Sequence, residues 1–139
     1  MASYPTVLHT EEVMRDGLQI EDANIPVEAK VRILDALSET GLKEIAVGSF
    51  ASPKWTPQMA CIEELIQKFH PKPGIRYTYA AFNDRGKELA KSYTPPLSPR
   101  IREWGLSFTM CDVFTRRNVN RGQEQERAGW PKQIERAKE

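Results

Sequence analysis

The sequence predicts an α/β fold made of four successive β/α units. Short runs with the composition of strands alternate with longer segments of helical periodicity, and glycine or proline stops separate them. This alternation favours a parallel sheet covered by helices, because parallel strands need crossover connections and helices supply them. The length of 139 residues, with 40% hydrophobic and 28% charged residues, fits one ordinary globular domain.

The first unit begins with an extended stretch at 6–13 and turns through Gly17. Its helix is clearer, because Pro26 suits the first helical position and Gly41 supplies a stop. An amphipathic helix is predicted between them from the apolar residues that recur at helical spacing, Val27, Val31, Leu34 and Leu37.

The second unit begins with a short apolar run at 43–50, which predicts a buried strand ending near Ser49. A loop with two prolines follows at 51–58. The Pro-Lys-Pro-Gly sequence at 71–74 ends the second helix, whose apolar residues are Met59, Ile62, Leu65, Ile66 and Phe69.

The third unit consists of a strand at 75–82 and a short helix after Gly86. Residues 94–105 hold three prolines and predict a long loop. The predicted order then continues with a fourth strand at 106–111, a polar loop at 112–120 and a last helix from about Gly122, interrupted near Trp130 and Pro131.

Composition limits the classes of function. The chain has 20 Lys and Arg residues against 19 Asp and Glu residues, so its net charge of +1 gives no reason to expect a nucleic-acid or membrane partner. Cys61 and Cys111 are far apart and suggest neither a disulfide framework nor a zinc site. No run approaches the roughly 20 apolar residues of a membrane span, and no signal-like segment opens the sequence. We therefore expect a cytoplasmic protein.

The first loop carries the residues best suited to chemistry. Arg15 and Asp16 are an adjacent cation and carboxylate that follow the predicted first strand, and loops at the carboxyl ends of parallel strands gather reactive groups. A fixed guanidinium can stabilise an oxyanion, and a carboxylate can bind a hard cation. A solvated ion pair in a turn is the alternative interpretation of the same two residues.

Several sequence blocks carry a family pattern, in order along the chain. They are Glu-Glu-Val-Met-Arg-Asp-Gly-Leu-Gln at 11–19, the segments 25–31 and 34–42, and Ser-Phe-Ala-Ser-Pro-Lys-Trp-Thr-Pro-Gln-Met at 49–59. Weaker similarities are Asn83 with Gly86, and Phe114 with 118–120. Together the blocks cover nearly the whole chain, which resembles the 3-hydroxy-3-methylglutaryl-CoA lyase-like family.

The resemblance implies the N-terminal half of a TIM (β/α)8 barrel and a metal-dependent carbon–carbon lyase that acts on an acyl-CoA or a hydroxy acid. It also implies that Asp16 binds a divalent cation, Mg or Mn, and that Arg15 faces the oxygen that becomes negative as the carbon–carbon bond breaks. The candidates for hydrogen bonds to the substrate, or to the residues around it, are then Gln19, Ser49, Asn83 and Asn120.

Two features depart from the lyase pattern. Position 46 holds alanine where the pattern has a glutamate, and Glu44 would lie roughly 6 to 7 Å further back on the same strand face. The family's His-x-His ligands and its cysteine-bearing glycine-rich loop belong to a later part of the pattern, and His9 and His70 cannot form such a pair. Asp16 alone leaves most of a coordination sphere to water, so we expect no complete metal site in one chain.

The same pattern predicts assembly. Four open parallel strands leave free edges, so we expect a homo-oligomer or a complementing C-terminal half. The charged last helix has no stop signal, which indicates a truncated sequence. Three functions stay open: a lyase-like polypeptide that holds part of its active site, a condensing synthase or carboxyltransferase of the same superfamily, and an inactive half-barrel that acts through self-assembly or partner binding.

Overall fold

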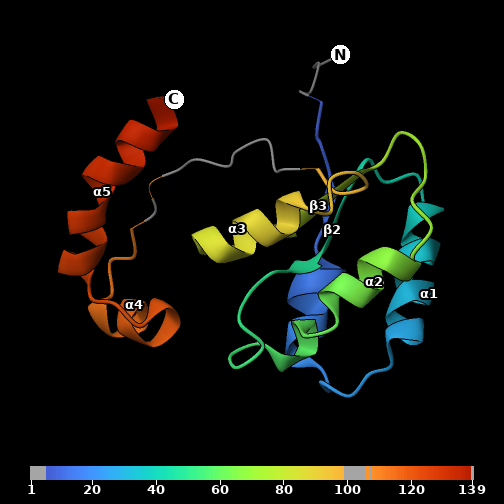
Figure 1. The fold of residues 1–139 in the computed structure, drawn as a ribbon, viewed down its shortest axis with the longest axis horizontal. Helices are drawn as coiled ribbons and strands as arrows, with labels where there is room; N and C mark the ends of the chain where they lie inside the picture. The colour runs from blue at the N-terminus through green and yellow to red at the C-terminus, as the bar shows by residue number, and fades with distance from the viewer. Residues whose placement is uncertain (1–5, 99–105, 107, 139) are drawn as a thin grey trace, which may run out of the picture. The chain divides into compact units, whose positions relative to one another are not determined.

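The computed structural model describes residues 6–98, 106 and 108–138. The chain divides into two compact units, Met1–Arg100 and Ile101–Glu139 (Figure 1). The predicted α/β class with parallel strand pairing is confirmed in the first unit. Its described residues form a three-stranded parallel sheet in the order β1 (Thr10–Glu11), β2 (Glu44–Ser49) and β3 (Arg76–Ala80).

Two helices, α1 (Val27–Ser38) and α2 (Ile62–Lys68), pack against each other and against β2 (Figure 1). α1 begins directly after Pro26, and Gly41, with φ of 85°, turns the chain after it. The other helical segments of the first unit are the short turns η1 (Val13–Gly17), η2 (Leu18–Ile20) and η3 (Pro57–Met59), and the helix α3 (Asp84–Lys91). The second unit contains α4 (Asp112–Val119) and α5 (Gln123–Lys138). Within the described ranges, no helix is long and apolar enough to cross a membrane.

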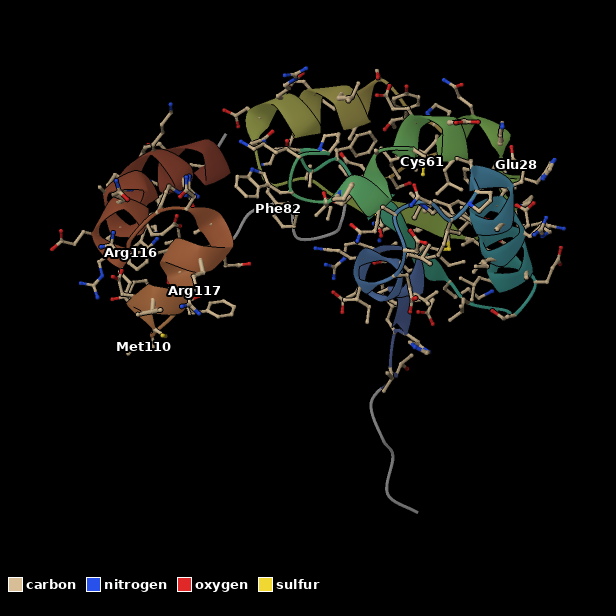
Figure 2. All side chains as sticks on the ribbon, turned by 90° about the horizontal axis from the view of Figure 1, so that it is seen from below. Glu28, Cys61, Phe82, Met110, Arg116 and Arg117 are labelled. Carbon is tan, nitrogen blue, oxygen red and sulfur yellow. The ribbon has the colours of Figure 1, made fainter. Side chains whose placement is uncertain are left out.

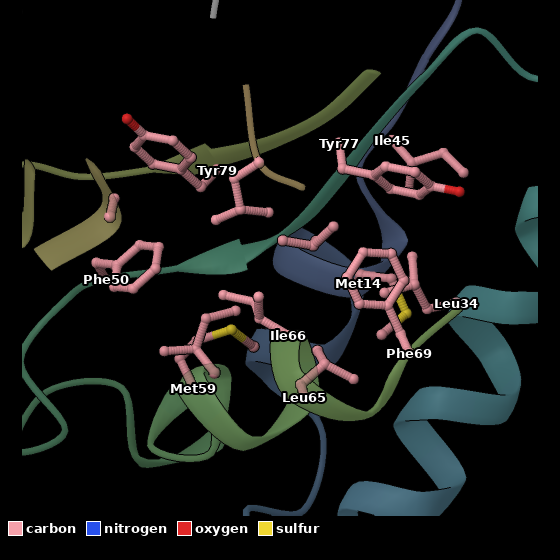
Figure 3. Close-up of a cluster of buried hydrophobic side chains, with 14 of the residues drawn as sticks. Met14, Leu34, Ile45, Phe50, Met59, Leu65, Ile66, Phe69, Tyr77 and Tyr79 are labelled. Carbon is pink, nitrogen blue, oxygen red and sulfur yellow. The ribbon is translucent and has the colours of Figure 1, made fainter. Parts of the chain in front are cut away.

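The hydrophobic core of the first unit gathers side chains from the sheet, α1 and α2 (Figure 3). Ile45 of β2 and Leu34 of α1 are both 0% exposed. The rings of Phe69 and Tyr77 meet edge to face, with their centroids 4.9 Å apart. The other buried members of this cluster are Met14, Leu18, Val47, Phe50, Met59, Ile62, Leu65, Ile66, Tyr79, Ala90 and Leu97.

The hydroxyl of Tyr77 joins the core to the helix ends. It donates to Ser38 Oγ at 2.9 Å and accepts from the backbone N–H of Lys72 at 2.9 Å. We expect Tyr77→Phe to lower the free energy of unfolding by about 1–3 kcal/mol, because these polar groups lose a partner in a buried place. Urea denaturation measures the loss. Tyr93→Phe is the matched control, since the Tyr93 hydroxyl donates to an exposed carboxylate, that of Glu63; equal losses in both variants would contradict the prediction.

The first strand is shorter than the predicted 6–13, because β1 spans only Thr10–Glu11. After it, the backbone N–H groups of Arg15 and Asp16 donate to the Glu12 carbonyl oxygen at 3.0 and 2.7 Å. Together with the bond from the Leu18 N–H to the Val13 carbonyl oxygen five residues earlier, they fold 13–17 into a single π-helical turn, η1. Local pairing of backbone groups therefore ends the strand before the predicted extended stretch ends.

The predicted fourth strand at 106–111 is wrong for the residues described there, since Leu106 and 108–111 belong to no strand. The place beside β3 is taken instead by Leu97, which forms a parallel bridge with Tyr77. The Ser98 N–H donates to the Tyr77 carbonyl oxygen at 2.8 Å. Three of the four predicted strands are thus present among the described residues.

The predicted polar loop at 112–120 is also wrong, because this segment forms α4. Figure 2 shows Arg116 and Arg117 on this helix, and both are exposed. Few of its residues are buried, so apolar periodicity, the signal that reveals the other helices, is weak here. The expected break near Pro131 is absent as well, since α5 continues through that residue.

Asp112 ties the start of α4 to the start of α5. Its carboxylate accepts from the Gln123 backbone N–H at 2.8 Å and from Arg116 Nε at 2.7 Å, and these bonds hold the pKa of Asp112 below its ordinary value of 3.8. A folded-state pKa below the unfolded value means that the stabilisation is present at higher pH and is lost as the pH falls through the folded-state pKa.

We therefore expect the helical signal of the full chain in circular dichroism to fall as the pH drops through the folded-state pKa of Asp112. Other carboxyl groups titrate there too, so the measurement is the difference between the chain and Asp112→Asn, which keeps an oxygen acceptor but cannot ionise. The wild-type chain should be the more helical of the two at neutral pH, and this advantage should disappear in acid. Parallel pH profiles would show that Asp112 contributes nothing.

Candidate functional site

Arg15 and Asp16 lie in η1, the turn that follows β1 at the carboxyl end of that strand. η1 packs against the central strand β2. Arg15 Nη1 is 3.4 Å from Asp16 Oδ1, and the side chains are 23% and 74% exposed, respectively. The guanidinium is thus largely covered, while the neighbouring carboxylate faces solvent, where a ligand can reach it.

A second carboxylate, that of Glu12, holds Arg15 in place. Arg15 Nε donates to Glu12 Oε2 at 2.6 Å, a charge-assisted hydrogen bond that fixes the plane of the guanidinium. Sequence reasoning does not single out Glu12 as a site residue. Residues three apart face each other in a helical turn, and the predicted strand at 6–13 concealed that signal.

Ser49 and Asn83 are engaged in local hydrogen bonds. Ser49 ends β2 and is 2% exposed, and its Oγ accepts from the Ala51 N–H at 3.2 Å. Asn83 follows β3, and its Oδ1 accepts from the Gly86 N–H at 2.8 Å, so it caps α3. In the structure, these two side chains support the loops in which they lie.

The start of α3 approaches the end of β2 closely. A Cβ atom on Gly86 would lie 2.6 Å from the Phe50 carbonyl oxygen, so the position requires glycine. The Phe50 N–H in turn donates to the Ala80 carbonyl oxygen at 2.8 Å. Ser49 and Asn83 therefore lie at the carboxyl ends of their strands, as Arg15 and Asp16 do, and this is the edge of a parallel α/β sheet where ligands bind.

The two other predicted contact residues lie elsewhere. Gln19 is half-buried in η2, the turn that continues directly from η1. Asn120 ends α4 in a left-handed conformation, with φ of 55°, and it belongs to the second unit. The structure thus brings Arg15, Asp16 and Gln19 into consecutive turns and leaves Asn120 in a separate unit.

Ala46, where the lyase pattern has a glutamate, is fully buried and pairs in register with Thr78. Thr78 is 0% exposed, and among the described residues its Oγ1 has no hydrogen-bond partner. Glu44 does not replace the carboxylate, because its oxygens lie 3.2 Å from Thr10 Oγ1 and 3.4 Å from Arg76 Nη1. This part of the sheet therefore differs chemically from the lyase pattern.

The side chains around Asp16 do not complete a metal site. Across the ranges that the structure describes, no three His, Cys, Asp or Glu side chains gather in a way that could hold a metal ion. The neighbouring carboxylate of Glu12 is bound to Arg15. Hard divalent cations take about six oxygen ligands, so this donor set does not fit a complete centre.

Curated proteins similar in sequence to this chain are hydroxymethylglutaryl-CoA lyases. The 3-hydroxy-3-isohexenylglutaryl-CoA/hydroxymethylglutaryl-CoA lyase of Pseudomonas aeruginosa is 41% identical over 106 residues, which are 76% of this chain and 33% of the relative. The mitochondrial hydroxymethylglutaryl-CoA lyase of Mus musculus is 36% identical over 121 residues, 86% of this chain and 35% of the relative. The chain thus spans about a third of the length of the curated relatives it matches. No protein-family model matches it.

Solved structures of similar fold are lyases of the same kind. The HMG-CoA lyase of Brucella melitensis matches with a TM-score of 0.73 and 27% identity, over 92% of this chain and 43% of that one. The HMG-CoA lyase of Acinetobacter baumannii, in complex with coenzyme A and 3-methylmalate, matches with a TM-score of 0.74 and 26% identity, over 98% of this chain and 43% of that one. These neighbours agree with the predicted TIM-barrel family. By sequence and by fold, the chain is similar to hydroxymethylglutaryl-CoA lyases, which it matches over part of their length.

Proposed function

We propose that this chain supplies the arginine and the aspartate of a lyase active site, and that the complete site cleaves a carbon–carbon bond in a hydroxyacyl-CoA or a related hydroxy acid. One observation carries the proposal: Glu12 fixes Arg15 beside the exposed carboxylate of Asp16, at the carboxyl end of β1. The names of the relatives support the reaction, and the coenzyme A complex supports the substrate class.

Arg15 is suited to the charge that develops in such a cleavage. As the bond to the carbon beside a thioester breaks, its electron pair forms an enolate, and negative charge collects on the thioester oxygen. A guanidinium that is already oriented stabilises this charge without reorganising, and it keeps its proton throughout. In this proposal Glu12 orients Arg15, and Gln19, in the turn that follows, is a polar group available to the substrate. Substrate contacts by Ser49, Asn83 and Asn120 stay predictions.

Asp16 is the proposed ligand of a divalent cation, Mg or Mn. Its carboxylate is 74% exposed, and hard cations prefer carboxylate oxygen. The other ligands come from outside the described residues or from a second chain, because the described ranges hold no suitable group of three. In this proposal Asp16 therefore supplies one ligand, and residues outside the described ranges or in a second chain supply the others.

We also propose that the partial barrel is completed by association, with a second copy or with a complementing C-terminal half. Among the described strands, β1 pairs with β2 alone, so its other edge is free. Val7 and Leu8, just before β1, are 84% and 58% exposed. A free strand edge with apolar neighbours favours pairing with another chain.

Size-exclusion chromatography with light scattering tests the association. The chain should run as a dimer or a larger species at micromolar concentration, and a charged residue in place of Leu8 should shift it towards monomer. Glu21 is an exposed residue that belongs to no strand, and Glu21→Ala serves as the control that should leave the mass unchanged. A monomer throughout this concentration range would overturn self-association.

The buried alanine at position 46 favours a second candidate function, an inactive barrel segment that acts through self-assembly or partner binding. In a condensing synthase or a carboxyltransferase of the same superfamily, Arg15 and Asp16 would lie in the active site as well. Assays with the substrates of a synthase or a carboxyltransferase would distinguish these enzymes from a lyase.

A coupled assay for acetyl-CoA released from hydroxymethylglutaryl-CoA tests the lyase proposal, with Mg, with Mn or with a chelator. The full chain is assayed alone and as a chimaera in which it replaces the matching third of the P. aeruginosa lyase, which supplies the rest of the barrel. Turnover by the chimaera supports the proposal. A folded chimaera without turnover in either metal would favour the inactive segment.

A further inference from the structure

We propose that Lys30 and Cys61 form an oxidation-sensitive pair, in which peroxide oxidises the Cys61 sulfur and the Lys30 amine then closes a sulfur–nitrogen bridge between α1 and the start of α2. The pair lies apart from Arg15 and Asp16 in the sequence. The inference stands independently of the proposed lyase reaction.

The geometry brings a buried amine to a reachable sulfur. Lys30 is 2% exposed, and its Nζ donates to the Gln58 carbonyl oxygen at 2.8 Å and to Cys61 Sγ at 3.2 Å. Cys61 Sγ is 3.9 Å from the same carbonyl oxygen, so the three groups form a triangle. Cys61, labelled in Figure 2, immediately precedes α2 and is only half-buried, so the residue is not closed off from a small oxidant.

The surroundings of Lys30 are unusual for a lysine. It forms no ion pair with a carboxylate among the described residues, and the small cavity beside it, about 10 Å³, is walled mainly by apolar side chains such as Met59 and Ile62. A buried ammonium without a counter-ion is costly. Of its two hydrogen-bond partners in the described structure, only the Cys61 thiol can supply a negative charge, because the Gln58 carbonyl is neutral.

The proposed reaction balances with one molecule of hydrogen peroxide. The Cys61 thiolate attacks a peroxide oxygen, the O–O bond breaks, and a sulfenic acid forms, while the leaving hydroxide takes a proton from the Lys30 ammonium and becomes water. This proton transfer leaves the Lys30 amine neutral beside an uncharged sulfenic acid. The neutral amine attacks the sulfur, an S–N bond forms, and the S–O bond breaks to release a second water. The sulfur is oxidised, the peroxide is reduced, and the protein loses two hydrogen atoms.

The bridge acts on segments that lead to the candidate site. It joins positions 31 residues apart in the sequence and replaces the Lys30 ammonium, which donates to the Gln58 carbonyl, with a neutral nitrogen that keeps a single N–H. Gln58 lies in η3, and its Nε2 donates to the Glu21 carbonyl oxygen at 3.1 Å, next to η2. A covalent bond between α1 and α2 therefore stiffens the support of the turns that carry Gln19 and, before it, Arg15.

Peptide mass spectrometry of the full chain after peroxide treatment and digestion without reductant tests the proposal. We expect a cross-linked pair of peptides, joined through Lys30 and Cys61, that is lighter than their sum by two hydrogen atoms and is released by dithiothreitol. Cys111 is an internal control because it is exposed, and it should oxidise without forming a bridge.

Lys30→Arg is the matched variant, because it keeps a positive donor but lacks the attacking amine. It should abolish the cross-link and let Cys61 proceed to sulfinic and sulfonic acid. If this variant fails to fold, dimedone added with peroxide to the wild-type chain gives the second measurement, since it traps the sulfenic acid and must lower the yield of the bridge. The proposal is overturned if wild-type Cys61 stays reduced while Cys111 oxidises, or if Cys61 reaches sulfinic acid without a bridge.

Discussion

Arg15→Met should lower kcat of an active lyase assembly by roughly 100- to 1,000-fold, the usual effect of removing one donor to a developing oxyanion. Methionine keeps the apolar stem of the side chain and removes the guanidinium. Because the enolate charge develops as the bond breaks, the substrate in its ground state gains little from Arg15. KM should therefore change much less than kcat.

The acetyl-CoA assay on the chimaera measures this effect. Arg15→Lys keeps the charge but loses the forked donor that Glu12 orients, and we expect an intermediate loss. Arg32→Met is the matched control, since Arg32 is an exposed arginine of α1, and it should leave kcat unchanged. A large rise in KM at constant kcat would instead assign Arg15 to uniform substrate binding.

The sequence predicts those parts of the fold in which local pattern and tertiary packing agree. α1 has a proline start, a helical stripe of apolar residues and a glycine stop, and the structure confirms it. The fourth strand fails because apolar composition at 106–111 does not decide pairing, and Leu97 takes the position beside Tyr77 instead. α4 was missed because hydrogen bonds of Asp112 stabilise it, and no apolar stripe reveals such bonds.

The candidate site shows the same limit. The family pattern identifies Arg15 and Asp16, and the structure places them together at a strand end. Glu12 is not identified from the sequence because its role depends on a helical turn, whereas the sequence predicts an extended stretch at 6–13. In the sequence, nothing distinguishes Lys30 from the other lysines of predicted helices. Only the structure shows that its amine lies 3.2 Å from Cys61 Sγ, beside mainly apolar side chains.

Leu34→Ala should lower the free energy of unfolding by about 2–5 kcal/mol. Leu34 is 0% exposed and belongs to the core cluster together with Ile45 and Phe69 (Figure 3). Truncation removes apolar atoms from the core and leaves a cavity that β2 and α2 cannot close without breaking their own contacts. Since small proteins are stable by only about 5–15 kcal/mol, this loss is a large share of the total.

Ile33→Ala separates burial from every other consequence of the change. Ile33 is the preceding residue of α1, and its side chain has as many carbon atoms, but it is 39% exposed. Alanine raises helix propensity at both positions, by slightly more in place of isoleucine, so helix formation alone would favour both variants. Urea denaturation of the two variants should therefore show a much larger loss for Leu34→Ala, because only that side chain lies wholly inside the core. Equal losses would mean that α1 does not bury the face assigned to it, and the packing of α1 on the sheet would then need revision.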